Sequence, residues 1–270
     1  MIDKPMLLKI SHSTHYTFDA PIPYGLQKLR LTPKSRAGQR VISWQTDVTG
    51  GRVELSYTDH HNNQVDLVNA EAGTREIRII AHGEVETIDN HGIIGTHGGF
   101  VPVWMFLRQT ALTRAGKHVS AITRKIDVSD RLKGLHDLSA AILEAVPYSK
   151  DDLDVSATAE DAFSRGFGVC QDHAQIFISA ARKLGIPARY VSGYLRIDGE
   201  NAGQAASHAW AEAHVDDLGW VGFDISNGTS PDERYVRVAT GLDYRGAAPV
   251  SGLVFGDHGE KLVVSVHVEQ

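Results

Sequence analysis

The chain of 270 residues contains one cysteine, Cys170, in the segment GFGVCQDHA at residues 166–174. A single cysteine excludes an internal disulfide and most structural zinc sites, so Cys170 is either a buried inert thiol or a reactive one. The glycines before it allow a tight backbone approach, and Cys170 falls where a helix should begin. The free N–H groups and the dipole at a helix start favour a thiolate and could bind a developing oxyanion. This context makes Cys170 a candidate nucleophile and leaves the inert alternative open.

A thiol nucleophile needs a base, and two later segments could supply it. His208 opens the strand-like segment HAWAE, and Asp224 ends the segment GWVGFD at residues 219–224. A hairpin of these segments would place the imidazole, which takes the thiol proton, beside a carboxylate that fixes its tautomer. Because side chains alternate across a strand, His208 and Asp224 share a face only if paired residue numbers sum to an even value, as in 214 with 220.

The first hundred residues are predicted to form β structure. The even-numbered residues from Leu8 to Phe18 are mostly apolar or aromatic, and the residues between them are polar. This alternation with a period of two is typical of a strand. Further short runs occur at 26–31, 41–48, 53–57, 65–68 and 76–88, separated by Gly, Pro, Asn and Asp. Gly83 interrupts the last run and predicts a bulge. Several short strands joined by turns predict an antiparallel β-sandwich.

The glycine-rich segment 92–102 predicts a boundary between a first domain, residues 1–100, and a second domain, residues 101–270. Helical spacing follows from Ser129 to Val146, then from Thr158 to Gly166 and from Cys170 to Leu184. Strands are expected at 188–197, 208–215, 220–225, 235–240 and 262–268, and we assign them to the second domain. Strands, helices and strands in this order predict an α+β protein.

Three segments of the sequence resemble motifs of the transglutaminase-like superfamily and follow one another in the same order as in that superfamily. The resemblance is to bacterial members in particular, which are often described as cysteine proteases. The segment GVCQDHA with GIPARYVSGY at 185–194 carries the first motif, and HAWAE at 208–212 the second. The third, GWVGFD followed by Asn227, departs from the family pattern where Ile225-Ser226 replaces Pro-Thr. His12, Tyr16 and QKLRL at 27–31 resemble the family's N-terminal region. The resemblance implies a papain-like core of helices packed on an antiparallel sheet behind the sandwich.

The resemblance also implies an activity. Cys170 would attack an amide carbonyl to form a thioester, His208 would act as general base and then acid, and Asp224 would orient His208. Water as the acceptor would make the protein a peptidase or amidase, and an amine would make it a protein-glutamine transglutaminase. A non-catalytic binding protein that retains the fold is a further alternative. The expected partner is a peptide or protein substrate with an amide or glutaminyl group.

Further side chains are expected around these three. The Cys170 N–H and one more donor would bind the oxyanion, with Tyr148 and Gln171 as candidates. Trp210 is expected to line the cleft or the core and to help position the substrate. Glu212 is expected to bond Arg189 or Arg196.

Composition excludes several other classes of function. The net charge is −6 and no run of Lys or Arg occurs, which argues against nucleic acid as a partner. We expect no membrane span, because no stretch of about 18 apolar residues occurs, and no signal peptide, so a cytoplasmic location is expected. The pair His60-His61 lies in a turn-like segment, and no EF-hand-like loop occurs, so we expect no metal and no cofactor.

Overall fold

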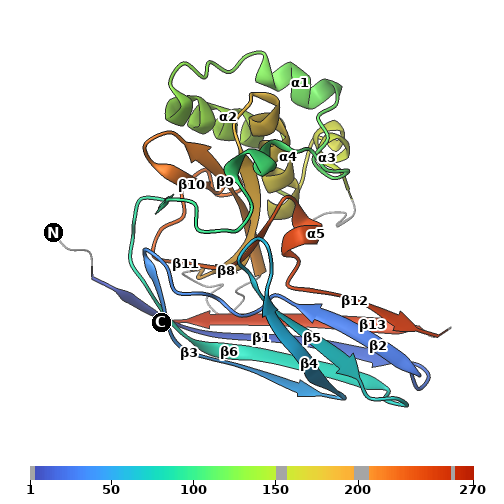
Figure 1. Ribbon diagram of the computed structural model, residues 1–270. Helices are drawn as coiled ribbons and strands as arrows, with labels where there is room; N and C mark the ends of the chain where they lie inside the picture. Colours follow the sequence, from blue (N-terminus) through green and yellow to red (C-terminus); the bar gives the residue numbers. More distant parts are fainter. Residues whose placement is uncertain (1–3, 150–156, 198–206, 257–258) are drawn as a thin grey trace.

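The computed structural model describes residues 4–149, 157–197, 207–256 and 259–270. Within them the chain forms a two-sheet antiparallel sandwich and a core of helices on a third sheet, which confirms the predicted α+β class (Figure 1). One sandwich sheet has the order β13-β1-β6-β3 and the other has the order β12-β2-β5-β4. Their strands are β1 (Met6–Phe18), β2 (Tyr24–Leu29), β3 (Gln39–Thr49), β4 (Gly51–Thr58), β5 (Gln64–Ala70), β6 (Glu76–Thr87), β12 (Val250–Phe255) and β13 (Glu260–Glu269).

The sandwich forms because its strands carry the alternating pattern that the sequence shows. In β1 the residues from Leu8 to Phe18 alternate between buried and partly exposed, and Phe18 and Ile77 belong to the apolar interior between the two sheets. Gly83 does not form the expected bulge, because it pairs in register with both Ile10 and Trp44. A Cβ at Gly83 would lie 2.1 Å from the Ser43 carbonyl oxygen, so glycine is required there by close strand packing.

The two C-terminal strands correct the predicted assignment of all later strands to the second domain. Strand β13 pairs with β1 from Lys9 to Phe18, and β12 pairs with β2. Figure 1 accordingly shows the red C-terminal strands among the blue strands of the sandwich. Both ends of the chain therefore build the sandwich, and the residues between them form the core. The boundary near residue 100 stays a prediction.

The core places its helices on a five-stranded antiparallel sheet of order β11-β8-β9-β10-β7. The strands are β7 (Ile93–Gly95), β8 (Ala188–Leu195), β9 (Ser207–Val215), β10 (Gly219–Phe223) and β11 (Tyr235–Gly241). The helices are η1 (Val103–Leu107), α1 (Lys117–Thr123), α2 (Arg131–Ala145), α3 (Ala159–Arg165), α4 (Cys170–Lys183) and α5 (Tyr244–Ala247). Helix α2 begins after Asp130 rather than after Ser129, because the Asp130 side chain accepts the Lys133 N–H. Helix α4 packs against β8 and β9.

Two side chains of the sandwich form hydrogen bonds with β11, the edge strand of the core sheet. The side-chain amide of Gln39 donates to the Arg237 carbonyl (2.9 Å) and accepts the Arg237 N–H (2.8 Å). Asn63 makes the same two-point contact with Thr240, with both distances 2.8 Å. These amides satisfy backbone groups that an edge strand would leave unpaired. The sandwich therefore holds a fixed position against the sheet that carries His208.

Candidate active site

Local sequence places Cys170 at the first residue of α4. Helix α3 begins at the capping pair Thr158 and Asp161 and ends at Gly166, whose φ of +82° suits glycine. The Asp172 carboxylate accepts the Val169 N–H (3.1 Å) and so caps the start of α4. Cys170 is the first helical residue, so its N–H has no intrahelical partner and points out of the helix end.

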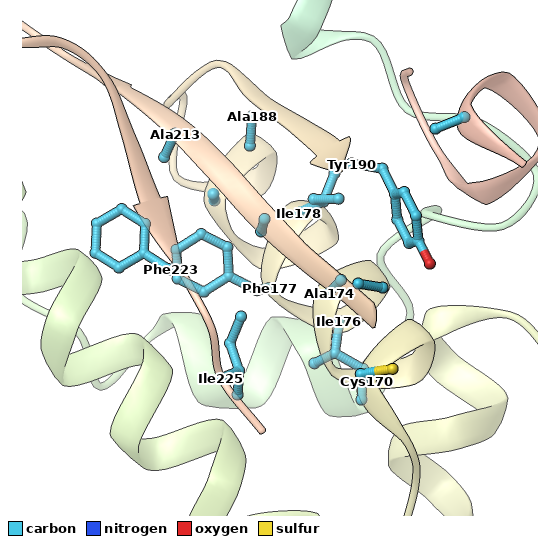
Figure 2. Close-up of a cluster of buried hydrophobic side chains, with 14 of the residues drawn as sticks. Cys170, Ala174, Ile176, Phe177, Ile178, Ala188, Tyr190, Ala213, Phe223 and Ile225 are labelled. Atoms are coloured by element: carbon cyan, nitrogen blue, oxygen red, sulfur yellow. The ribbon is translucent and has the colours of Figure 1, made fainter. Parts of the chain in front are cut away.

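Cys170 lies at one end of the buried apolar cluster rather than in its middle. In Figure 2 its sulfur points away from Phe177 and Phe223. The side chain is buried, with 7% of the residue exposed, and its thiol lies 3.5 Å from the Gln171 side-chain oxygen. A purely packing role would direct the sulfur into the cluster, so this orientation favours a reactive thiol.

The hairpin of β9 and β10 brings His208 and Asp224 together. Trp220 pairs with His214, the even-sum register that a shared face requires. Gly219, the first residue of β10, has a φ of +79°, and a Cβ there would lie 2.2 Å from the Gly95 carbonyl oxygen. His208 Nε2 then lies 2.6 Å from Asp224 Oδ2.

Asp224 is buried, and three side chains donate to the same oxygen, Oδ2. They are His208, the Asn227 amide at 2.7 Å and the Tyr235 hydroxyl at 2.8 Å. Burial alone would raise the pKa of Asp224, but these hydrogen bonds and the charge of His208 lower it below its usual value. An ionised carboxylate accepts only, so His208 donates from Nε2, which leaves Nδ1 for the thiol.

The environment of His208 favours the imidazolium. Burial alone would lower the pKa of His208, but hydrogen bonds with Asp224 and Cys170, together with their negative charges, raise it to about 10. The imidazole therefore interacts with a carboxylate on one side and a thiol on the other. The positive charge of the imidazolium stabilises the carboxylate and the thiolate. In this arrangement the imidazole can take the thiol proton, which gives a thiolate–imidazolium pair.

The three secondary candidates occupy different places. Tyr148 is half-exposed, its backbone pairs with Gly168, and the charge of Cys170 contributes, after burial, to raising the pKa of its hydroxyl. Gln171 contacts the thiol, as described above. Trp210 is buried and stacks on the His208 ring, with 6.2 Å between ring centroids. Trp210 can hold His208 in place, whereas Gln171 contacts the thiol.

Tyr235 is the contact that the sequence did not reveal. It lies on β11, eleven residues after Asp224, and its hydroxyl reaches the carboxylate because the Asp224–Thr229 turn returns the chain along the sheet. No spacing rule links these two positions. Only the folded sheet shows that Tyr235 helps to orient Asp224.

Glu212 lies two residues beyond Trp210 and is fully buried between two arginines. It accepts from Arg189 Nε at 2.5 Å, one of the two expected partners, and from Arg237 Nε at 2.6 Å. Burial opposes ionisation, but the charges of Arg189 and Arg237 lower the pKa of Glu212 to about 2. This buried ion cluster links the strands β8, β9 and β11.

The described residues contain neither a cluster of metal-ligating side chains nor a membrane-spanning helix. In that part of the chain, no group of three or more His, Cys, Asp and Glu side chains is arranged to hold a metal ion. Among the helices of the same residues, none is long and apolar enough to cross a membrane.

Comparison with known families agrees with this geometry. The model of the transglutaminase-like superfamily matches residues 120–225, and that of the bacterial transglutaminase-like N-terminal region matches residues 8–86. The chain belongs to the transglutaminase-like superfamily. The superfamily match contains Cys170, His208 and Asp224, and the N-terminal match covers strands β2 to β5 and most of β1 and β6.

Similar proteins extend along nearly the whole chain. An uncharacterized protein of Mycobacterium leprae is 27% identical over 275 residues, which cover 97% of this chain and 98% of that protein. An uncharacterized protein of Mycobacterium tuberculosis is 24% identical over 289 residues, 97% of this chain and 91% of that protein. A crystal structure from Cytophaga hutchinsonii, named a "Putative Cysteine Protease", has a TM-score of 0.77 at 20% identity, covering 100% of this chain and 93% of that one. The structural likeness shows that the two chains share a fold.

Proposed function

We propose that this protein is a thiol-dependent hydrolase of amide bonds, a peptidase or amidase that acts on a peptide-type substrate. The observation that carries the proposal is the position of His208, which bonds Asp224 at 2.6 Å and interacts with the thiol of Cys170, the first residue of α4. The superfamily membership and the likeness to a protein named as a cysteine protease support it.

In the proposed reaction the Cys170 thiolate adds to the amide carbonyl carbon, and the carbonyl electron pair moves to oxygen. The Cys170 N–H stabilises this oxyanion, and Tyr148 or Gln171 supplies the second donor. When the intermediate collapses, the C–N bond breaks and the His208 imidazolium protonates the leaving amine. A thioester remains. His208 then removes a proton from water as the water attacks the thioester, and the collapse of this second intermediate breaks the C–S bond, releases the acid and restores the thiolate–imidazolium pair.

The first test measures whether Cys170 is activated. Because the chain has one cysteine, intact-mass spectrometry after iodoacetamide treatment reports only on Cys170 alkylation. We expect Cys170 in the folded protein to react faster than glutathione at pH 7, and His208→Ala to slow it. His214→Ala, on the same strand but packed against Trp220, is the matched control and should retain the rate. A folded wild-type protein whose Cys170 reacts no faster than glutathione contradicts the proposal.

The second test distinguishes hydrolysis from amine transfer. A tagged glutamine-containing peptide is incubated with the protein, with and without a primary amine, and the products are identified by mass. We expect hydrolysed product in both samples. A product that carries the added amine would instead identify a transglutaminase, the alternative acceptor for the same thioester.

A further inference from the structure

A cavity of about 140 Å³ lies between the sandwich and the core, beside the candidate active site. Its volume is close to the roughly 150 Å³ of an engineered apolar cavity that binds benzene. The sandwich forms one wall with Thr14 and Tyr16 of β1 and with Leu262 and Val264 of β13. The core forms the other wall, to which Gln171 and His208 contribute. The cavity therefore has room for one side chain of moderate size.

His208 itself lines the cavity. Gln171, which lines it, contacts the Cys170 thiol, and Tyr190 on β8 lines it as well. Figure 2 shows the Tyr190 hydroxyl and the Cys170 sulfur on the same side of the buried cluster. In the proposed reaction His208 protonates the leaving amine, so a group seated against His208 belongs to the amine side of the substrate amide.

The walls carry little charge apart from His208. Among the described residues that line the cavity, none is Lys, Arg, Asp or Glu. Burial lowers the pKa of His12 to about 4, and burial with the charge of Glu260 raises the pKa of Tyr16 to about 12, so both are neutral at pH 7. A cationic substituent would lose its hydration there and meet the positive charge of His208, and an anionic one would meet a charge already paired with Asp224 and the Cys170 thiolate. The chemistry of the walls selects an uncharged occupant.

We propose that this cavity is a specificity pocket for an uncharged substituent, up to about the size of a benzene ring, on the amine side of the substrate amide. The sandwich would then contribute directly to substrate selection through β1 and β13. The proposal rests on the proposed function, because it assigns His208 to the leaving amine.

The test uses chloroacetamides that differ only in the substituent on nitrogen: N-methyl, N-benzyl and N-carboxymethyl. The Cys170 thiolate displaces chloride, so that an S–C bond forms as the C–Cl bond breaks, and intact mass gives the second-order rate. Each rate is divided by that of glutathione with the same reagent. We expect N-benzyl to exceed N-methyl by about tenfold, as partial burial of the ring implies. N-carboxymethyl should show no such gain.

Strand β13 offers a matched pair of variants. Val264 lines the cavity, whereas its neighbour Val263 does not and lies on the other face of the strand. Their exposed fractions are similar, at 48% and 51%, so tryptophan should be tolerated at both positions. Val264→Trp should reduce the benzyl-to-methyl ratio to about one by filling the pocket. Val263→Trp should retain the wild-type ratio.

The outcomes separate the two proposals. A wild-type ratio near one, or a ratio that Val264→Trp does not lower, overturns the pocket even when iodoacetamide shows an activated Cys170. A thiol that iodoacetamide shows to be inert contradicts the proposed function instead. In that event, the pocket is tested by the change in backbone amide chemical shifts when unreactive N-benzylacetamide is added. We expect the shifts of Thr14 and Val264 to change in the wild-type protein, and the change at Thr14 to be lost in Val264→Trp. Unchanged shifts in the wild-type protein overturn the pocket.

Discussion

Replacing Asp224 by asparagine should leave the shape of the site intact while removing the negative charge that favours the His208 imidazolium. The asparagine oxygen can still accept from Nε2, which is 2.6 Å from the carboxylate in the wild-type protein. A hydrogen bond to a charged group contributes about 1.5–3 kcal/mol and a neutral one about 0.5–1.5 kcal/mol, so the substitution removes about 1–1.5 kcal/mol, where 1.36 kcal/mol corresponds to one pKa unit. We therefore expect the pKa of His208, raised to about 10 in the wild-type protein, to fall by about one unit.

The same free energy fixes the expected effect on Cys170. Loss of imidazolium stability shifts the thiolate–imidazolium pair toward the neutral thiol and imidazole, and only the thiolate is alkylated. The iodoacetamide rate at pH 7 should therefore fall, by at most about tenfold, because the thiolate fraction cannot change by more than the equilibrium constant of the pair does. The rate should recover as pH rises, because hydroxide removes the thiol proton without help from His208. Intact mass over a series of pH values measures both effects.

Asp232→Asn is the matched control for this experiment. Asp232 is a carboxylate in the chain segment just after Asp224, but it pairs with Arg234 and not with His208. Its replacement should leave the alkylation rate close to that of the wild type. The reasoning is refuted if Asp224→Asn, with a circular dichroism spectrum like that of the wild type, is alkylated at the wild-type rate at pH 7.

Two predictions concern the scaffold, and both are measured by urea denaturation. Glu212→Gln leaves Arg189 and Arg237 buried without their carboxylate, so the free energy of unfolding should fall by about 3–5 kcal/mol. Since folding lowers the pKa of Glu212 to about 2, its stabilising contribution is present above its unfolded pKa and is lost as pH falls toward 2. The wild-type and Glu212→Gln stabilities should thus converge in acid, and a constant difference would contradict this account. Gly219→Ala should destabilise more than Gly73→Ala: both have positive φ, but a Cβ at Gly219 meets the Gly95 carbonyl oxygen, whereas at Gly73 it meets nothing within 4 Å. Equal losses would show that strain in φ, rather than the contact, limits this turn.

The sequence by itself determined the local geometry of the site. Glycine at residues 166 and 168, with Asp172 three residues after Val169, sets the start of α4 and so the position of Cys170. The parity of residue numbers in the β9–β10 hairpin restricts which residues share a face with His208. These features depend on neighbours within one turn or one hairpin, where backbone geometry leaves few alternatives.

Only the tertiary structure decided which distant segments meet. The strand at the C-terminus could have extended the core sheet, but it pairs with β1 because that arrangement completes the sandwich sheet. Tyr235 reaches Asp224, and Val264 faces the cavity beside His208, across separations that no local period encodes. The physical reason is that strand partners are chosen by burying apolar faces and satisfying edge hydrogen bonds over the whole chain, so the local pattern of a strand specifies its faces but not its neighbour.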